Sequence, residues 1–161
     1  MKQIAVFGDS WIWGDELVDP AHPEYECCFT QNDEYRLANC FSGLISKELN
    51  LPYTNYGHPG ASLQSTMWTF LWWLNRTPNP GDYLVLVGLT GTDRQSWYNP
   101  DHISYSNDPD WNKFIHSTWV NFGSSVIPQE WQQFGKQYLT LSHCDELSLL
   151  NYQQAVLFFD G

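Results

Sequence analysis

The sequence predicts an α/β domain with a mostly parallel sheet, and two observations support this fold class. The expected elements alternate along the chain, in the order strand, helix, strand, helix, strand, helix, helix. Such alternation is typical of parallel strands joined by right-handed helical crossovers. The strand expected at residues 83–89 is also a continuous apolar run, which indicates a strand covered on both faces. With 161 residues and neither an internal repeat nor a linker, the chain is expected to form one domain, 1–161.

The first half of the chain provides two strands and one helix. Residues 4–7 are apolar and run into a Gly-Asp-Ser turn, so a buried strand is expected to end there. Residues 11–32 are rich in Pro, Asp and Glu without a sustained period, which predicts a helical turn and then a long loop. Apolar residues recur at helical spacing over 35–49, with Asn50 as the expected end of that helix, and 51–56 form the second strand.

In the second half, Ser62 is expected to cap a helix, and a loop rich in Pro separates that helix from the third strand. A second long irregular region covers 97–122, and two helices, 128–141 and 145–159, follow it. A fold that stops after a helix leaves three strands and an open sheet edge. We therefore expect a domain shortened at its C-terminus, whose sheet is completed by self-association or by another chain.

The composition excludes several classes of partner. The 18 acidic and 7 basic side chains give a net charge of −11, which opposes binding to nucleic acid or to an anionic membrane surface. No signal peptide precedes the first strand, and the longest apolar run, 67–74, is too short to span a bilayer. The four cysteines match no zinc or redox spacing, so we expect free thiols in the cytoplasm and neither a metal nor another cofactor.

The aromatic content is high, since Trp, Tyr and Phe together make up 17% of the chain. One core does not need so many rings, so some of them are expected on a binding face. Trp11 and Trp13 flank Ser10, where they either wall a pocket or pack in the core. Trp68 and Trp72 have the spacing of neighbours on one helix face, which suits core packing or an interface.

Three short motifs directly follow the three expected strands, at the edge where open parallel sheets bind ligands. They are Gly8-Asp9-Ser10-Trp11, Asn55-Tyr56-Gly57-His58-Pro59-Gly60-Ala61-Ser62 and Gly88-Leu89-Thr90-Gly91-Thr92-Asp93-Arg94. A Ser at a strand-to-helix turn can expose its hydroxyl beside backbone N–H groups, and the Gly60 N–H can face an oxyanion. Taken singly, the first and second motifs favour an ordinary turn, and the third is also compatible with a loop held by an Asp93–Arg94 pair.

Taken together, these motifs resemble the SGNH (GDSL) hydrolase family over about residues 4–95. The resemblance implies a three-layer, flavodoxin-like fold and a serine ester hydrolase. It makes Ser10 the nucleophile and assigns the oxyanion to the backbone N–H groups of Ser10 and Gly60. The residues expected to surround them in the site are Asp9, Trp11, His58, Thr90, Asp93 and Arg94.

The third motif departs from the family pattern Gly-x-Asn-Asp, because Asp93 stands where the family has Asn. A carboxylate repels a developing oxyanion that an amide N–H would stabilise, and loss of one such donor costs roughly 100- to 1,000-fold in rate. Either Thr90 or Arg94 replaces that donor, or the chain is a weak or inactive catalyst. The altered motif also resembles divergent family members encoded by large bacteriophages, which makes the virion a second expected location.

The second departure from the family pattern is the lack of a recognisable catalytic base. The family's Asp-x-x-His block does not occur in this chain, although a serine nucleophile needs a base within hydrogen-bond reach. Of the five histidines, only His58 is expected near the site. The sequence therefore favours a shortened hydrolase that lacks the final strands and this block.

Two functions of different classes follow. The first is an ester hydrolase acting on a small-molecule or glycan ester, such as an O-acetylated sugar, because aromatic side chains suit flat sugar faces. The second is a non-catalytic binding or assembly module with a glycan or protein partner, for example a phage structural component. Asp93, the missing base and the many aromatic residues of 97–119 favour this second function. A metal-dependent hydrolase is disfavoured, since no His/Asp spacing matches a metal site.

Overall fold

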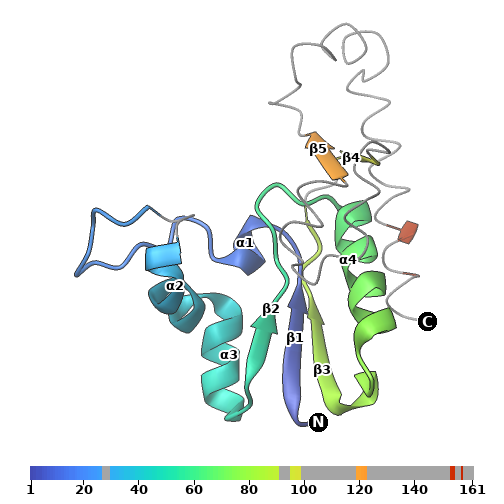
Figure 1. Cartoon of the computed structure of the whole chain (residues 1–161), viewed down its shortest axis with the longest axis horizontal. Coiled ribbons are helices and arrows are strands. Elements are labelled where there is room, and N and C mark those ends of the chain that lie inside the picture. Colours follow the sequence, from blue (N-terminus) through green and yellow to red (C-terminus); the bar gives the residue numbers. More distant parts are fainter. Residues whose placement is uncertain (27–29, 91–94, 99–118, 123–152, 155–156, 158–161) are drawn as a thin grey trace, which may run out of the picture. The chain divides into compact units, whose positions relative to one another are not determined.

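The computed structural model describes residues 1–26, 30–90, 95–98, 119–122, 153–154 and 157 (Figure 1). The chain divides into two compact units. The first is formed by Met1–Pro59 and Phe70–Gly88, and the second by Gly60–Thr69 and Leu89–Gly161. The first unit contains all three strands that the sequence predicts, and the second contains a separate pair of strands.

The sheet of the first unit consists of three parallel strands, β1 (Gln3–Phe7), β2 (Tyr53–Asn55) and β3 (Tyr83–Val87). Their order is β2-β1-β3, so β1 lies in the middle and its two neighbours form the edges of this sheet in the described part of the chain. These strands confirm the predicted α/β class with a parallel sheet. Because β2 and β3 lie on opposite sides of β1, the strand order reverses beside β1. The crevice outside the carboxyl ends of the strands at such a reversal is where open sheets bind ligands.

One of the predicted helices is interrupted in the structure. The helices described are α1 (Ser10–Trp13), α2 (Asp33–Asn39), α3 (Phe41–Leu49) and α4 (Leu63–Arg76), with short 3-10 turns at Thr30–Asn32 and Pro80–Asp82. The single helix predicted over 35–49 is wrong, because Cys40 is extended and separates α2 from α3. The break brings Gly43 so close to α2 that a Cβ there would lie 2.0 Å from the Leu37 carbonyl oxygen. Asn50, in the left-handed conformation, ends α3 as predicted.

Ser62 caps α4 as predicted. The Ser65 N–H donates to Ser62 Oγ (3.2 Å), and the Ser62 N–H donates to Ser65 Oγ (2.9 Å). This reciprocal pair satisfies two backbone donors that the start of a helix otherwise leaves open. Both serines are fully buried.

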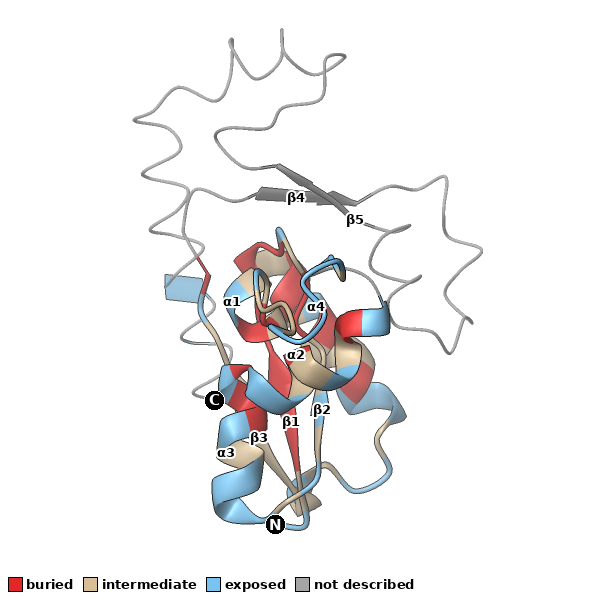
Figure 2. Cartoon of the chain, turned by 90° about the vertical axis from the view of Figure 1, so that its left-hand side faces the viewer, coloured by how far each residue is buried: buried red, intermediate tan, exposed pale blue. Residues whose placement is uncertain are grey.

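Side chains of β1 alternate between two apolar clusters, one on each face of the sheet. Ile4 and Val6 are fully buried in the first cluster, on the face of α1 and α3. Ala5 and Phe7 are fully buried in the second, on the face of α4, where Trp73 joins them. Helices therefore cover both faces of the sheet, as the apolar run of the third strand predicts (Figures 1 and 2).

The second cluster is rich in aromatic rings. Phe7 stacks on Tyr56 with ring centroids 5.1 Å apart, and its ring meets those of Phe70 and Trp73 at steep angles. Trp73 in turn meets the Tyr83 ring edge-on at 5.1 Å. Five rings therefore pack together in this cluster, whereas Trp11 (83% exposed) and Trp68 (50% exposed) lie outside the core, as the aromatic content of the chain leads one to expect.

The second unit contains an antiparallel pair of strands, β4 (Gln95–Tyr98) and β5 (Trp119–Phe122). The irregular region predicted over 97–122 is thus wrong at these residues. Their mixed polar and aromatic sequence lacks the alternation that marks a strand, and the pairing joins segments distant in the chain. The helix predicted at 128–141 lies outside the described residues, and of the helix at 145–159 only 153–154 and 157 are described, as helical. Within the described residues, no helix is both long and apolar enough to cross a membrane.

Candidate active site

Ser10 opens a single helical turn directly after the central strand. The carboxylate of Asp9, which is only 5% exposed, accepts the Trp11 N–H (3.0 Å) and so caps α1. At the other end, Gly14 adopts φ 85° and donates its N–H to the Ser10 carbonyl (3.0 Å). Asp9 was expected to be a binding residue, and in the structure its carboxylate holds the turn on which Ser10 stands. Ser10 itself is half-buried.

The side chain of Ile12, within this turn, packs against three glycines. A Cβ at Gly8, Gly57 or Gly88 would lie 2.5, 3.0 or 2.4 Å from a side-chain carbon of Ile12. Each glycine follows a different strand of the sheet, so Ile12 is packed against the carboxyl ends of all three strands. We call this arrangement of Gly8, Gly57, Gly88 and Ile12 the glycine clasp. Gly57 belongs to the second motif at the strand ends, and in the structure its backbone is closely approached by α1.

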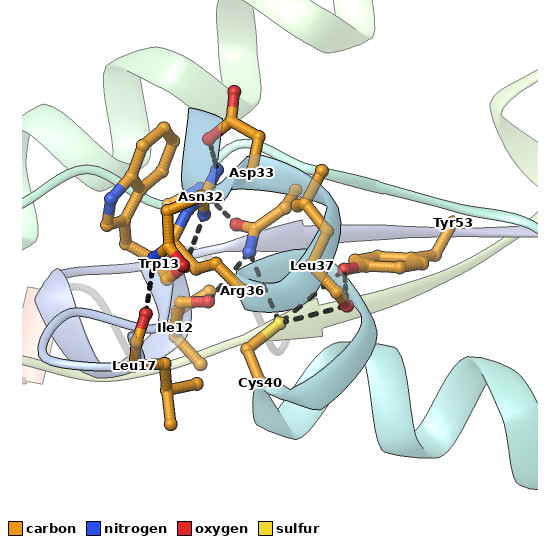
Figure 3. Close-up of polar contacts among 11 residues, drawn as sticks. Ile12, Trp13, Leu17, Asn32, Asp33, Arg36, Leu37, Cys40 and Tyr53 are labelled. Carbon is orange, nitrogen blue, oxygen red and sulfur yellow. Dashed lines mark hydrogen bonds and ion pairs between the residues drawn. The ribbon is translucent and has the colours of Figure 1, made fainter. Parts of the chain in front are cut away.

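Two polar side chains hold the carbonyl end of the same turn. Asn55 donates from Nδ2 to the Ile12 carbonyl (2.8 Å), while its Oδ1 accepts the Gly57 N–H (2.8 Å). Arg36 of α2 donates from Nη1 to the Trp13 carbonyl (2.6 Å), and its guanidinium carbon lies 3.7 Å from the centre of the Trp13 ring (Figure 3). Trp13, the last residue of the turn, is half-buried and packs against Arg36.

Neither Arg36 nor Asn32, which lies before it in the chain, was predicted to act near the site. Both side chains are buried, and Asn32 accepts the Asp19 N–H (3.0 Å) while donating to the Leu17 carbonyl. Together they anchor the loop that follows α1 (Figure 3). From the sequence alone, Arg and Asn side chains are expected at the surface. No sequence signal therefore identifies the buried role of these two residues.

Backbone hydrogen bonds join the three strand ends. The His58 N–H donates to the Gly8 carbonyl (3.0 Å), the Gly88 N–H to the Phe7 carbonyl (2.8 Å) and the Tyr56 N–H to the Val6 carbonyl (2.8 Å). His58 is only 6% exposed. Its backbone is thus fixed beside Gly8, two residues before Ser10.

The remaining predicted site residues do not lie in the first unit. Gly60 and Thr90 belong to the second unit. Gly60 is exposed with φ 78°, a left-handed conformation that favours glycine, and Thr90 is buried. Asp93 and Arg94 lie outside the described residues. Of the predicted set, the structure therefore brings together Asp9, Ser10, Trp11 and His58.

Two surface features of the first unit concern binding. Trp11, next to Ser10, is 83% exposed, so it contributes little to the core. Separately, a polar cleft of about 520 Å³ lies between the loop after α1 and α2. In one wall of this cleft the His22 and Tyr25 rings stack 4.8 Å apart. The residues that line the polar cleft are Asp19, His22, Tyr25, Gln31, Glu34, Tyr35, Ala38 and Asn39, which include no Lys or Arg.

The buried Cys40 and the half-buried Tyr53 form a polar pair. The Cys40 sulfur lies 3.5 Å from the Tyr53 hydroxyl and 3.2 Å from Ser42 Oγ. Burial opposes ionisation of the thiol, but hydrogen bonds from Ser42, Tyr53 and the backbone outweigh it and lower the pKa of Cys40. Burial, followed by the contact with Cys40, raises the pKa of Tyr53 above its ordinary value.

Among the described residues, no group of three or more His, Cys, Asp or Glu side chains could hold a metal ion. Comparisons with protein-family models, with curated proteins and with solved structures find no match to this chain.

Proposed function

We propose that this chain is a serine ester hydrolase of the SGNH type, acting on a small-molecule or glycan ester. The observation that supports the proposal is the position of Ser10. It begins a turn held at the carboxyl end of the central strand, beside the reversal of strand order where open parallel sheets bind ligands. A nucleophilic serine needs such a turn, because it lifts the hydroxyl out of the sheet and keeps backbone N–H groups beside it.

In the proposed reaction, Ser10 Oγ attacks the ester carbonyl carbon while its proton passes to a base. The tetrahedral oxyanion accepts a hydrogen bond from the N–H group of Ser10, and the resemblance to the family assigns the further donors to Gly60 and to Thr90 or Arg94. Collapse of this intermediate expels the alcohol, which takes the proton back from the base. Water then hydrolyses the acyl-serine by the same steps in reverse. His58 is the base we propose, because its backbone is fixed beside Gly8.

The test is hydrolysis of p-nitrophenyl acetate by the purified chain, compared with Ser10→Ala. We expect the variant to lose about 1,000-fold or more in kcat/KM, since removal of a nucleophile leaves only binding and oxyanion stabilisation. Ser46→Ala is the matched control, because that serine lies on α3 and donates only to the Leu51 carbonyl. Equal rates for the wild type and Ser10→Ala would contradict the proposal.

A second candidate is a non-catalytic module that binds a neutral glycan. It is favoured by the 83% exposure of Trp11 and by the polar cleft, whose acidic and aromatic lining suits hydroxyl groups and flat sugar faces. Under this function, glycan binding on an array survives Ser10→Ala and is lost in Trp11→Ala or in Tyr35→Ala. Loss of binding in Ser10→Ala alone would instead favour the hydrolase.

A further inference from the structure

Arg36 is an unusual residue to find in the interior of this unit. It is 2% exposed and is the largest fully buried side chain in the described part of the chain. A buried charge is costly unless it is paired and hydrogen-bonded. Its only ion-pair partner among the described residues is Asp33, whose carboxylate lies 2.7 Å from Nη2 but is 41% exposed. Arg36 Nε, also buried, has no hydrogen-bond partner there.

The remaining contacts of the guanidinium go to one residue, Trp13. Nη1 donates to the Trp13 carbonyl (2.6 Å), and the guanidinium stacks on the Trp13 ring (Figure 3). Trp13 is the last residue of α1, whose first residue is Ser10. Arg36 therefore connects α2 to the far end of the turn that carries Ser10.

A helix of one turn has almost no stability of its own, because one turn fixes several dihedral angles for very few hydrogen bonds. Its direction must come from contacts with other elements. The glycine clasp fixes its middle through Ile12. Asn55 and Arg36 bind two consecutive carbonyls, those of Ile12 and Trp13, from β2 and from α2. Three elements thus determine how α1 is rotated about its own axis.

We propose that Arg36 is a positioning residue, which fixes the direction of the Ser10 hydroxyl by holding the Trp13 carbonyl and ring. This inference rests on the proposed function of Ser10 as the nucleophile. A reacting group must be held to within roughly 0.5 Å of its productive place. A shift of about 1 Å can cost 100-fold in rate. Loss of the hydrogen bond from Arg36 to the Trp13 carbonyl allows α1 to rotate, because only the bond from Asn55 to the Ile12 carbonyl then remains. That rotation moves Ser10, at the other end of α1.

The variants that test this proposal are Arg36→Met and Arg36→Lys. Met keeps the length of the side chain but removes the charge and the donors, and Lys keeps one charged donor. With p-nitrophenyl acetate, we expect Arg36→Met to lower kcat by about 10- to 100-fold with KM within twofold. Arg36→Lys should recover part of that loss. The matched control is Trp73→Phe on the opposite face of the sheet, which weakens packing around Phe7 without touching α1. At equal loss of Tm, this control should retain kcat within twofold.

A second measurement follows the turn itself and does not depend on catalysis. The Gly14 and Asp15 N–H groups both donate to the Ser10 carbonyl, so their hydrogen exchange reports the order of α1. We expect Arg36→Met to speed their exchange at least tenfold relative to the Tyr56 N–H, which donates to β1. Unchanged exchange, or a kcat loss no larger than that of Trp73→Phe, would overturn the proposal. If the wild type itself lacks Ser10-dependent activity, the proposed function fails and the catalytic role of Arg36 with it. The exchange rates then still decide whether Arg36 orders α1.

Discussion

At the scale of single residues, the environment of His58 decides whether this chain has its own base. The His58 backbone is hydrogen-bonded to Gly8, and its side chain is buried in the same unit as Ser10. A general base must lie within hydrogen-bond reach of the serine hydroxyl, and we propose His58 for this role because its backbone is held two residues from Ser10 in the chain, at Gly8. Although the sequence has no Asp-x-x-His block, one histidine thus has its backbone fixed beside Gly8, two residues before Ser10.

We predict that His58→Gln lowers the rate of Ser10 labelling by a fluorophosphonate about 1,000-fold, because the serine hydroxyl loses its proton acceptor. The backbone hydrogen bond to Gly8 does not depend on the side chain, so the fold should be retained. Competition labelling at pH 7 measures the rate. His22→Gln serves as the control, since His22 is an exposed residue of the loop after α1 and interacts with Glu24. Labelling at the wild-type rate in His58→Gln would mean that another group is the base.

At the scale of elements, α1 is placed by packing rather than by its own sequence. The glycine clasp requires the absence of three Cβ atoms at three strand ends. At Gly88 the requirement is purely steric, because its backbone is not in the left-handed region and an added Cβ would lie 2.4 Å from Ile12 Cγ1. The crowding atom belongs to a buried side chain, so the strain cannot be relieved by moving into solvent.

We therefore predict that Gly88→Ala lowers the free energy of unfolding by about 1–3 kcal/mol through overpacking. Ile12→Ala alone should cost about 2–5 kcal/mol through the cavity it leaves. The double variant should cost less than the sum of the two, because Ile12→Ala removes the carbon atoms that the new Cβ meets. Urea unfolding measures all three. Gly81→Ala is the matched control, since a Cβ there meets no atom within 4 Å, and additive losses would contradict the clasp.

The elements that the sequence predicted well are those determined locally. The apolar run of β3 and the capping serine of α4 carry their own signals, and Asn50 ends α3 as expected. The break at Cys40 could not be predicted, because it depends on Gly43 reaching the Leu37 carbonyl across two helices. The role of Arg36 depends in the same way on a residue 23 positions away. The three motifs at the strand ends predict the candidate site, but no signal in the sequence predicts that Arg36 and Asn55 hold α1.

At the scale of the whole molecule, alkaline pH should weaken the fold through buried tyrosines. Burial raises the pKa of Tyr53 and of Tyr56 above the value of about 10 that an unfolded chain has. A raised pKa in the folded state means that the fold prefers the neutral phenol. The stability from this preference is fully present below pH 10 and is lost as the pH rises through the folded-state pKa. The lowered pKa of Cys40 has the opposite effect on stability: the folded chain prefers the thiolate, so this contribution to stability is lost as the pH falls through the folded-state pKa.

We predict that the free energy of unfolding of the wild type declines above pH 10, and that Tyr53→Phe declines less steeply. The variant should start about 1 kcal/mol lower at pH 8, because it loses the hydrogen bond that the Tyr53 hydroxyl donates to the Leu37 carbonyl. The measurement is urea unfolding at intervals from pH 8 to pH 11.5, and the quantity compared is the slope above pH 10, not the starting value. Tyr35→Phe, at the polar cleft, controls for the loss of one phenol from the chain. Parallel slopes for the wild type and Tyr53→Phe would show that Tyr53 ionises alike in the folded and unfolded chain, and that its ionisation does not determine stability at alkaline pH.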